Sequence, residues 1–170
     1  MPDDELAFAT IAYQSQLLRR GDLSPVELTQ LYLDRIDAYD EHLNAYLTVT
    51  AERAIASARA AEAAIQGGDW RGPLHGIPVA LKDLFDVVGL PTTAGSIILG
   101  EQIASRDATA ARRLFEAGAI LLGKTQMVEF AFGGAGINHH HGTPWNPWDL
   151  QEHRLPGGSS SGSGVAVSSG

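Results

Sequence analysis

The sequence predicts an α/β protein that is preceded by a mainly helical segment. Up to about residue 70, apolar side chains recur at the spacing of amphipathic helices. From Gly72 onward, short apolar runs alternate with helical patterns, which is typical of an α/β fold. There is no internal repeat and no clear linker. We therefore expect one domain over residues 1–170, with 1–70 mainly helical and 71–170 forming the α/β part.

The first two helices have clear end signals. Residues 1–20 have an amphipathic pattern, and Gly21 is expected to end this helix. A second helix is expected to begin after Ser24. Here Ser24, Pro25 and Glu27 combine an N-cap serine, a proline at the first helical position and a capping-box glutamate.

Helical spacing in the second helix continues to about residue 39. A third, alanine-rich helix is expected over residues 51–66, closed by Gly67 and Gly68. The apolar stripes of these helices indicate core packing rather than a ligand site.

Two buried strands are expected in the second part, at residues 77–81 and 119–122. Between them, residues 92–96 have the composition of a loop. Asp107 is expected to cap a helix that Gly118 ends.

Composition and charge exclude several classes of protein. The chain is 44% hydrophobic and 19% charged, which is typical of a globular protein. It has no cysteine, so disulfides, thiolate nucleophiles and cysteine-ligated zinc are excluded. The net charge of −8 argues against direct nucleic-acid binding. Residues 2–5 are unlike a signal peptide, and no apolar run approaches the ~20 residues that span a bilayer. We therefore expect a cytoplasmic protein without a membrane partner.

A glycine- and serine-rich run occupies residues 157–164. Glycines allow the backbone to approach a ligand closely, and serines supply hydroxyls. The alternative is a flexible linker. Pro156 before the run and the apolar residues 165–167 after it favour an ordered segment that leads into a buried helix or strand.

Several blocks of the sequence resemble the amidase signature family of serine hydrolases. The run GGSSSGSG at 157–164 is similar to the family's glycine- and serine-rich signature. GIPVALKD at 76–83, GKTQMVEF at 123–130 and NPW at 146–148 resemble further family blocks in the same order. Together they cover roughly residues 70–170. The resemblance implies a three-layer α/β/α fold with a mixed central sheet, of which this chain is the N-terminal part.

The resemblance also implies a Ser–cis-Ser–Lys triad. Lys82 corresponds to the family's base, and Ser159 to the bridging serine that follows a cis peptide bond. The family's nucleophilic serine comes about two dozen residues after the bridging serine, so it is expected downstream of Gly170. Ser160 and Ser161 are expected to support the loop by hydrogen bonding.

The chemistry of this triad requires a buried lysine. By position alone, Lys82 could instead be a surface lysine at a strand end. Desolvation lowers the pKa of a buried lysine, which can then act as a general base. Lys82 would take the proton of Ser159, Ser159 would take that of the nucleophile, and the transfers would later reverse.

Phe132 and Gly133 match the loop that lines the substrate pocket in the family. Core packing is the alternative for Phe132. Relatives often have asparagine at the position of Gln126, a departure without a clear chemical consequence.

Residues 118–125 satisfy the phosphate-loop pattern G-x-x-x-x-G-K-[ST]. A phosphate loop follows a strand and opens a helix, whereas residues 119–122 are themselves expected to be a strand. We therefore do not expect nucleotide binding.

Neither the histidines nor the acidic residues indicate a metal or glycosidase site. His139–His141 lie in a long irregular segment at 133–147, and consecutive side chains diverge too far for a compact metal site. Asp83, Asp86 and Glu129 border strands, where carboxylates are usually solvated or salt-bridged.

The expected activity is hydrolysis of a linear carboxamide through an acyl-enzyme, with a small-molecule amide as substrate and no metal or organic cofactor. Three alternatives stay open: a glutaminase A-subunit of a tRNA-dependent amidotransferase, a biuret or urea-derivative amidase, and a non-catalytic fragment without a nucleophile. A homo-oligomer or a partner subunit is compatible with each enzyme.

Overall fold

A mixed three-stranded sheet lies at the centre of the computed structural model, which describes residues 3–170. The strands are β1 (Tyr46–Val49), β2 (Pro78–Lys82) and β3 (Ile120–Thr125), in the order β1-β3-β2. The central strand β3 pairs antiparallel with β1 and parallel with β2. The expected α/β fold with a mixed sheet is confirmed.

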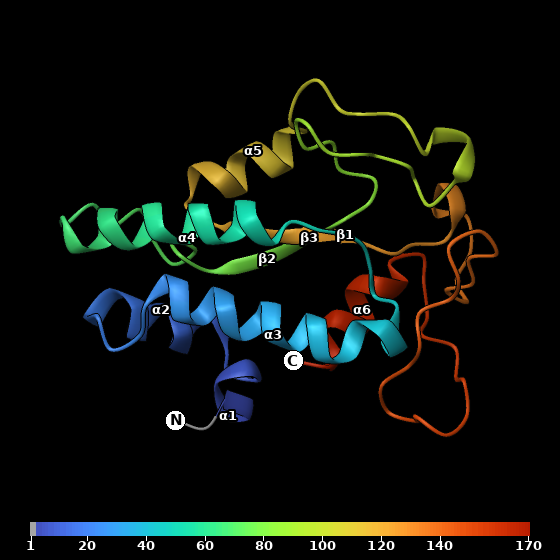
Figure 1. Ribbon diagram of the computed structural model, residues 1–170, viewed down its shortest axis with the longest axis horizontal. Coiled ribbons are helices and arrows are strands. Elements are labelled where there is room, and N and C mark those ends of the chain that lie inside the picture. Colours follow the sequence, from blue (N-terminus) through green and yellow to red (C-terminus); the bar gives the residue numbers. More distant parts are fainter. Residues whose placement is uncertain (1–2) are drawn as a thin grey trace.

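Helices cover both faces of this sheet. Figure 1 shows α5 above the strands, α1, α2, α3 and α6 below them, and α4 running alongside α3. The helices in residues 3–170 are α1 (Asp3–Ala7), α2 (Ile11–Arg20), α3 (Pro25–Leu43), α4 (Ala51–Gln66), α5 (Thr109–Glu116) and α6 (Ser161–Ser168), with short 3₁₀ helices at Ile97–Leu99 and Glu129–Ala131. None of them is long and apolar enough to cross a membrane.

The core is divided by the sheet into separate apolar clusters. On one side, Leu33 of α3 and the small side chains Ala54 and Ala58 of α4 pack against Ile120 and Leu122 of β3. The alanines allow α3 and α4 to approach the sheet closely, because a small side chain adds little distance between helix and strand. A second cluster joins α5 to β2 and β3 through Ala111, Leu81, Leu121 and Val87.

The N-terminal helix differs from the expected continuous helix. The helix is interrupted between α1 and α2. Thr10 caps α2, since its Oγ1 accepts a hydrogen bond from the Tyr13 N–H at 3.2 Å. Residues 1–2 of the expected helix lie outside the described residues. The expected stop at Gly21 is confirmed, since this glycine adopts the left-handed conformation with φ 75°.

The start of α3 and the bounds of α4 are confirmed. Ser24 and Glu27 form the complete capping box, with Pro25 at the first helical position. Helix α3 continues to Leu43 rather than ending near residue 39, and Asn44 ends it in the left-handed conformation. Helix α4 covers the expected residues 51–66.

One other expectation needs correction. Asp107 does not cap α5, because Ala108 holds that position and the Asp107 carboxylate instead accepts the Val88 N–H at 2.7 Å. The expectation that the glycine- and serine-rich run is an ordered segment rather than a linker is confirmed, because α6 begins inside it at Ser161. The loop at residues 92–96 and the irregular segment at 133–147 are as expected.

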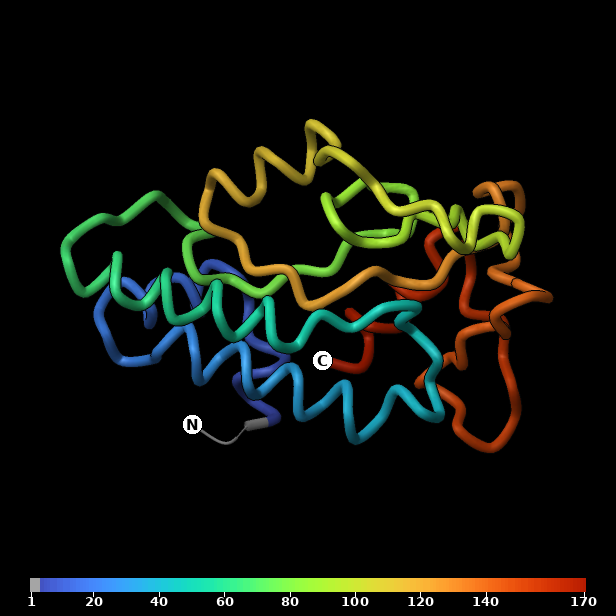
Figure 2. Tube along the Cα trace, turned by 45° about the horizontal axis from the view of Figure 1, so that its top comes forward, coloured from blue at the N-terminus to red at the C-terminus, as the bar shows by residue number. Residues whose placement is uncertain are grey.

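The loops that follow β2 and β3 gather at one end of the sheet. Figure 2 shows the segment between β2 and α5, in green to yellow, beside the orange segment that leads from β3 to α6. Because β2 and β3 are parallel, their carboxyl ends meet at this same edge. The candidate site lies there.

Candidate active site

Lys82 and Ser159 are in direct contact. Lys82 is the last residue of β2, and its Nζ donates a hydrogen bond to Ser159 Oγ at 2.7 Å. Ser159 lies in the loop just before α6, the helix that packs below β2 and β3. The amine therefore lies at the end of β2, and the hydroxyl lies on the loop before α6. The side chain of Lys82 is half-buried, so the simple alternative of a lysine projecting into solvent is wrong.

The backbone around Ser159 is held from two sides. Its carbonyl oxygen accepts the Val128 N–H at 3.0 Å. The Gly158–Ser159 peptide bond is cis, as the family resemblance implies. A side chain at Gly158 would lie 2.8 Å from the Gly136 backbone nitrogen and 3.1 Å from the Gly133 carbonyl oxygen. Only glycine therefore allows the loop at 133–136 to approach the segment that carries Ser159 so closely.

A second pair of hydroxyls lies next to this contact. Thr125 is the register partner of Lys82 in the parallel pair of strands, and its Oγ1 is 2.7 Å from Ser163 Oγ on α6. The Gly162 N–H also donates to the Gln126 carbonyl oxygen at 3.0 Å. These bonds fasten α6 to the end of β3. Neither Thr125 nor Ser163 was expected to belong to the site, although both lie in blocks, 123–130 and 157–164, that resemble the family.

Burial lowers the pKa of Lys82 below its ordinary value, because desolvation disfavours the charged ammonium. Among the side chains that the structure describes, no carboxylate forms a salt bridge with Lys82 that would offset this effect. A larger fraction of Lys82 is therefore neutral near pH 7 than for an exposed lysine. A neutral amine 2.7 Å from a hydroxyl can accept its proton.

Phe132 and Gly133 lie beside the same loop. Phe132 is 92% exposed, so it packs in no core formed by residues 3–170. A Cβ added at Gly158, one residue before Ser159, would lie 3.1 Å from the Gly133 carbonyl oxygen. Gly133 therefore lies close to the segment that carries Ser159, and the role of Phe132 and Gly133 in a substrate pocket stays a prediction.

The hydroxyl of the neighbouring Ser161 does not have the expected role. Ser161 is buried, and its Oγ has no hydrogen-bond partner among the described residues. Ser160 directly precedes α6, and its carbonyl oxygen accepts the Gly164 N–H at 3.1 Å in the first turn of that helix. The expectation that the Ser161 hydroxyl supports the loop is therefore wrong.

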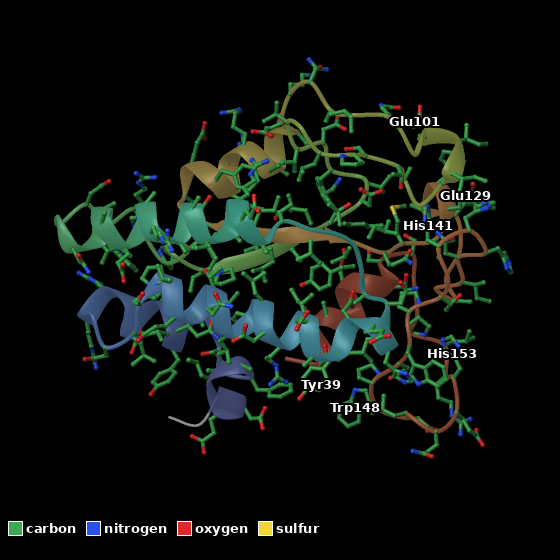
Figure 3. All side chains as sticks on the ribbon, viewed as in Figure 1. Tyr39, Glu101, Glu129, His141, Trp148 and His153 are labelled. Carbon is green, nitrogen blue, oxygen red and sulfur yellow. The ribbon has the colours of Figure 1, made fainter. Side chains whose placement is uncertain are left out.

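The histidines of residues 139–141 do not converge. His140 Nε2 lies 3.2 Å from Glu129 Oε1, while the His140 and His141 backbone N–H groups donate to Asn138 Oδ1. Figure 3 shows Glu129 and His141 at the loop-covered end of the sheet. A hydrogen bond from Ser96 and the nearby histidines lower the pKa of Glu129. Within residues 3–170, no group of three or more histidine or acidic side chains forms a metal site.

The residues of the phosphate-loop pattern lie in a different structure. Ile120–Thr125 forms strand β3, and Gly118 follows α5 in a left-handed conformation with φ 87°. Lys124 is completely buried, and its Nζ lies 2.7 Å from Asp83 Oδ1. A lysine in this position contacts a carboxylate rather than a phosphate. The pairing also confirms that Asp83 is salt-bridged.

Sequence comparison finds one family of known proteins. A family model described as amidase matches residues 27–170. The glutamyl-tRNA(Gln) amidotransferase A-subunit of Moorella thermoacetica is 46% identical over 166 residues, which cover 98% of this chain and 34% of that protein. The corresponding A-subunit of Halorhodospira halophila is 48% identical over 158 residues, covering 93% and 32%. The chain thus spans about a third of the length of these relatives.

Solved structures of known proteins have the same fold over most of this chain. One, described as an unexpected vestigial protein complex that reveals the origins of an s-triazine catabolic enzyme, superposes with a TM-score of 0.89 at 37% identity, covering 95% of this chain and 35% of that chain. The native peptide amidase from Stenotrophomonas maltophilia superposes with a TM-score of 0.84 at 36% identity, covering 93% and 33%.

Proposed function

Because the chain belongs to the amidase family, we propose that it supplies the base and the bridging serine of an enzyme that hydrolyses linear carboxamides. The single observation that carries this proposal is the 2.7 Å hydrogen bond from Lys82 Nζ to Ser159 Oγ. The third member, a nucleophilic serine, lies outside residues 1–170.

Proton transfer starts at Lys82. The neutral amine accepts the proton of Ser159, and Ser159 in turn accepts the proton of the nucleophilic serine as that oxygen attacks the amide carbon. The proton then returns through Ser159 to the departing nitrogen, which leaves as ammonia or an amine. Water attacks the resulting acyl-enzyme by the same route and releases the carboxylic acid. Lys82 is regenerated as the neutral base at the end of the cycle.

Phe132 and Gly133 line the substrate pocket in this proposal. The exposed ring of Phe132 offers an apolar surface to the substrate, and the Gly133 carbonyl oxygen lies close to Gly158 of the cis-bonded segment that carries Ser159. The pocket binds a small-molecule amide and requires neither a metal nor an organic cofactor. The cytoplasmic location stays a prediction.

A second candidate is a glutaminase chain of a tRNA-dependent amidotransferase. It is favoured by the 46–48% identity to A-subunits of glutamyl-tRNA(Gln) amidotransferases. Ammonia released from glutamine would then pass to a partner subunit, which would also contact the tRNA. The similarity to a structure described as a protein complex also supports a partner subunit.

Intact mass spectrometry before and after treatment with a serine-reactive fluorophosphonate tests the proposal. The natural protein should gain one adduct and should release ammonia from a panel of simple carboxamides. Release from glutamine alone would select the glutaminase. A protein that gains no adduct and hydrolyses no amide would overturn both candidates and leave the non-catalytic alternative.

A further inference from the structure

A fully buried ion pair lies next to Lys82 in the sheet, on the side opposite to the Lys82 side chain. Asp83, the next residue in the chain, and Lys124 of β3 are 1% and 0% exposed, and Lys124 Nζ lies 2.7 Å from Asp83 Oδ1. Successive side chains of an extended chain point to opposite sides. Lys82 therefore faces Ser159 below the sheet, whereas Asp83 points away from it toward Lys124.

The pair also joins three segments of backbone. Lys124 Nζ donates to the Pro91 carbonyl oxygen at 2.8 Å. The other carboxylate oxygen of Asp83 accepts the Thr93 N–H at 2.8 Å and the Thr93 hydroxyl. The Asp83 N–H itself donates to the Thr125 carbonyl oxygen at 3.1 Å. The backbone just after Lys82 is thereby tied to β3 and to the loop at 91–93.

We propose that Asp83 and Lys124 are positioning residues for Lys82, which hold the end of β2 in place and cancel the Asp83 charge beside the amine. The inference rests on the proposed function, in which Lys82 must be neutral to accept a proton. An unbalanced carboxylate next to Lys82 in the chain would favour the ammonium form and so oppose the base. The Lys124 ammonium on the far side of the sheet supplies the balancing charge.

Other charged groups around Lys82 are paired elsewhere or lie on more distant segments. Helix α6 and the loop at 156–160 carry no charged side chain. On α3, Arg35 pairs with Asp4, and the Asp40 carboxylate accepts the Ala45 and Tyr46 N–H groups.

Two further carboxylates lie on the loops of this end. Glu129 pairs with His140, and Asp86 follows β2 four residues after Lys82. The Asp83–Lys124 pair is therefore the charged group that adjoins Lys82 most directly.

The composition of the chain makes a direct test practical. Residues 1–170 contain two lysines, Lys82 and Lys124. With ¹³C-lysine labelling, the Cε resonances of both residues can be titrated by NMR, and the signal that is absent from Lys82→Met identifies Lys82. This readout needs no substrate, so it is independent of whether the proposed function holds.

The two single variants should shift the Lys82 titration in opposite directions. Lys124→Met leaves the Asp83 charge unbalanced and should raise the Lys82 midpoint by roughly half a pH unit or more. Asp83→Asn leaves the Lys124 charge unbalanced and should lower it by a similar amount. Arg59→Met, which removes an exposed charge on α4, is the matched control and should leave the midpoint unchanged. Equal midpoints in both variants and wild type would overturn the charge-cancelling role.

The double variant Asp83→Asn/Lys124→Met tests the positioning role. Because it leaves no unpaired buried charge, it can also be measured if a single variant fails to fold. Asparagine keeps an acceptor for Thr93, and methionine keeps the apolar stem of the lysine. The Lys82 midpoint should return close to that of wild type. In the enzyme that carries the nucleophile, kcat should fall by about 10- to 100-fold with KM little changed, because the amine is no longer held against Ser159.

A double variant with the kcat of wild type would overturn the positioning role. If the wild-type enzyme hydrolyses no amide, the proposed function fails, and the opposite shifts of the Lys82 midpoint still decide the charge-cancelling role by themselves.

Discussion

Lys82 Nζ and Ser159 Oγ lie 2.7 Å apart although 77 residues of chain separate them. The contact joins the end of β2 to the loop before α6, so it exists only when the sheet and that helix are packed together. Lys82 is the last residue of β2, and the loops that follow β2 and β3 meet at this edge of the sheet (Figure 2). Four predictions test this site and its support.

Replacing the base should abolish amide hydrolysis without unfolding the protein. Lys82→Met removes the proton acceptor, and general-base catalysis typically contributes about 10²- to 10⁴-fold in rate. We expect kcat to fall by that factor in the enzyme that carries the nucleophile, with the thermal unfolding temperature not lowered, because burial of the charged Lys82 amine opposes folding near pH 7. Arg59→Met is the control. Hydrolysis at the wild-type rate by Lys82→Met would contradict the assignment.

The stability of the protein should depend on pH through Lys82. Burial lowers the pKa of Lys82 in the folded state, so between the folded and unfolded pKa values the unfolded chain binds more protons. The destabilising effect of Lys82 is therefore fully present below the folded-state pKa and fades as the pH rises toward its ordinary value of 10.5.

Urea unfolding of wild type and Lys82→Met over the range from about pH 7 to pH 10 measures this effect. The free energy of unfolding of wild type, relative to the variant, should rise with pH. A difference that is constant or falls over this range would show that burial does not lower the pKa of Lys82.

Gly162 and Gly164 form a matched pair within α6. A Cβ at Gly162 would collide with the Ala45 carbonyl oxygen and with Gln126, whereas a Cβ at Gly164 meets nothing within 4 Å. Gly162→Ala should therefore destabilise the protein by about 1–3 kcal/mol or more. Gly164→Ala should be neutral or stabilise it by up to about 1 kcal/mol, because alanine is the better helix former. Equal effects in chemical denaturation would show that α6 does not pack this closely.

Phe132→Ala should change substrate binding and leave stability unchanged. The ring is 92% exposed, so its removal should alter the free energy of unfolding by no more than about 0.5 kcal/mol. If Phe132 lines the pocket, KM should rise several-fold for amides with an apolar substituent. Trp148→Ala is the control, at a residue that is 87% exposed and lies away from Glu129 on the segment between β3 and α6 (Figure 3). An unchanged KM in Phe132→Ala would remove this residue from the pocket.

Elements that depend on neighbours in the chain were predicted well. The capping box of Ser24 and Glu27 is complete in the structure, and α4 has the expected bounds. Gly21 ends α2 as expected. In each case the signal and the structure lie within one or two helical turns, so the local backbone energy decides the outcome.

Elements that depend on distant contacts were predicted less well. Asp107 has the sequence context of a helix cap, yet its carboxylate accepts the Val88 N–H instead. Strand β1 was not expected, because its four residues are recognised only by their pairing with β3. The role expected for Ser161 was wrong because its hydroxyl is buried away from any partner.

The sequence by itself determined which residues could carry the chemistry. The blocks around Lys82 and Ser159 identified both side chains, because the residue types and their order are readable without a fold. Only the tertiary structure decided that they touch, and that Asp83 and Lys124 form a buried pair behind them. The physical reason is that contact and burial depend on how strands and helices pack. Packing determines which charged side chains are desolvated and which side chains they contact.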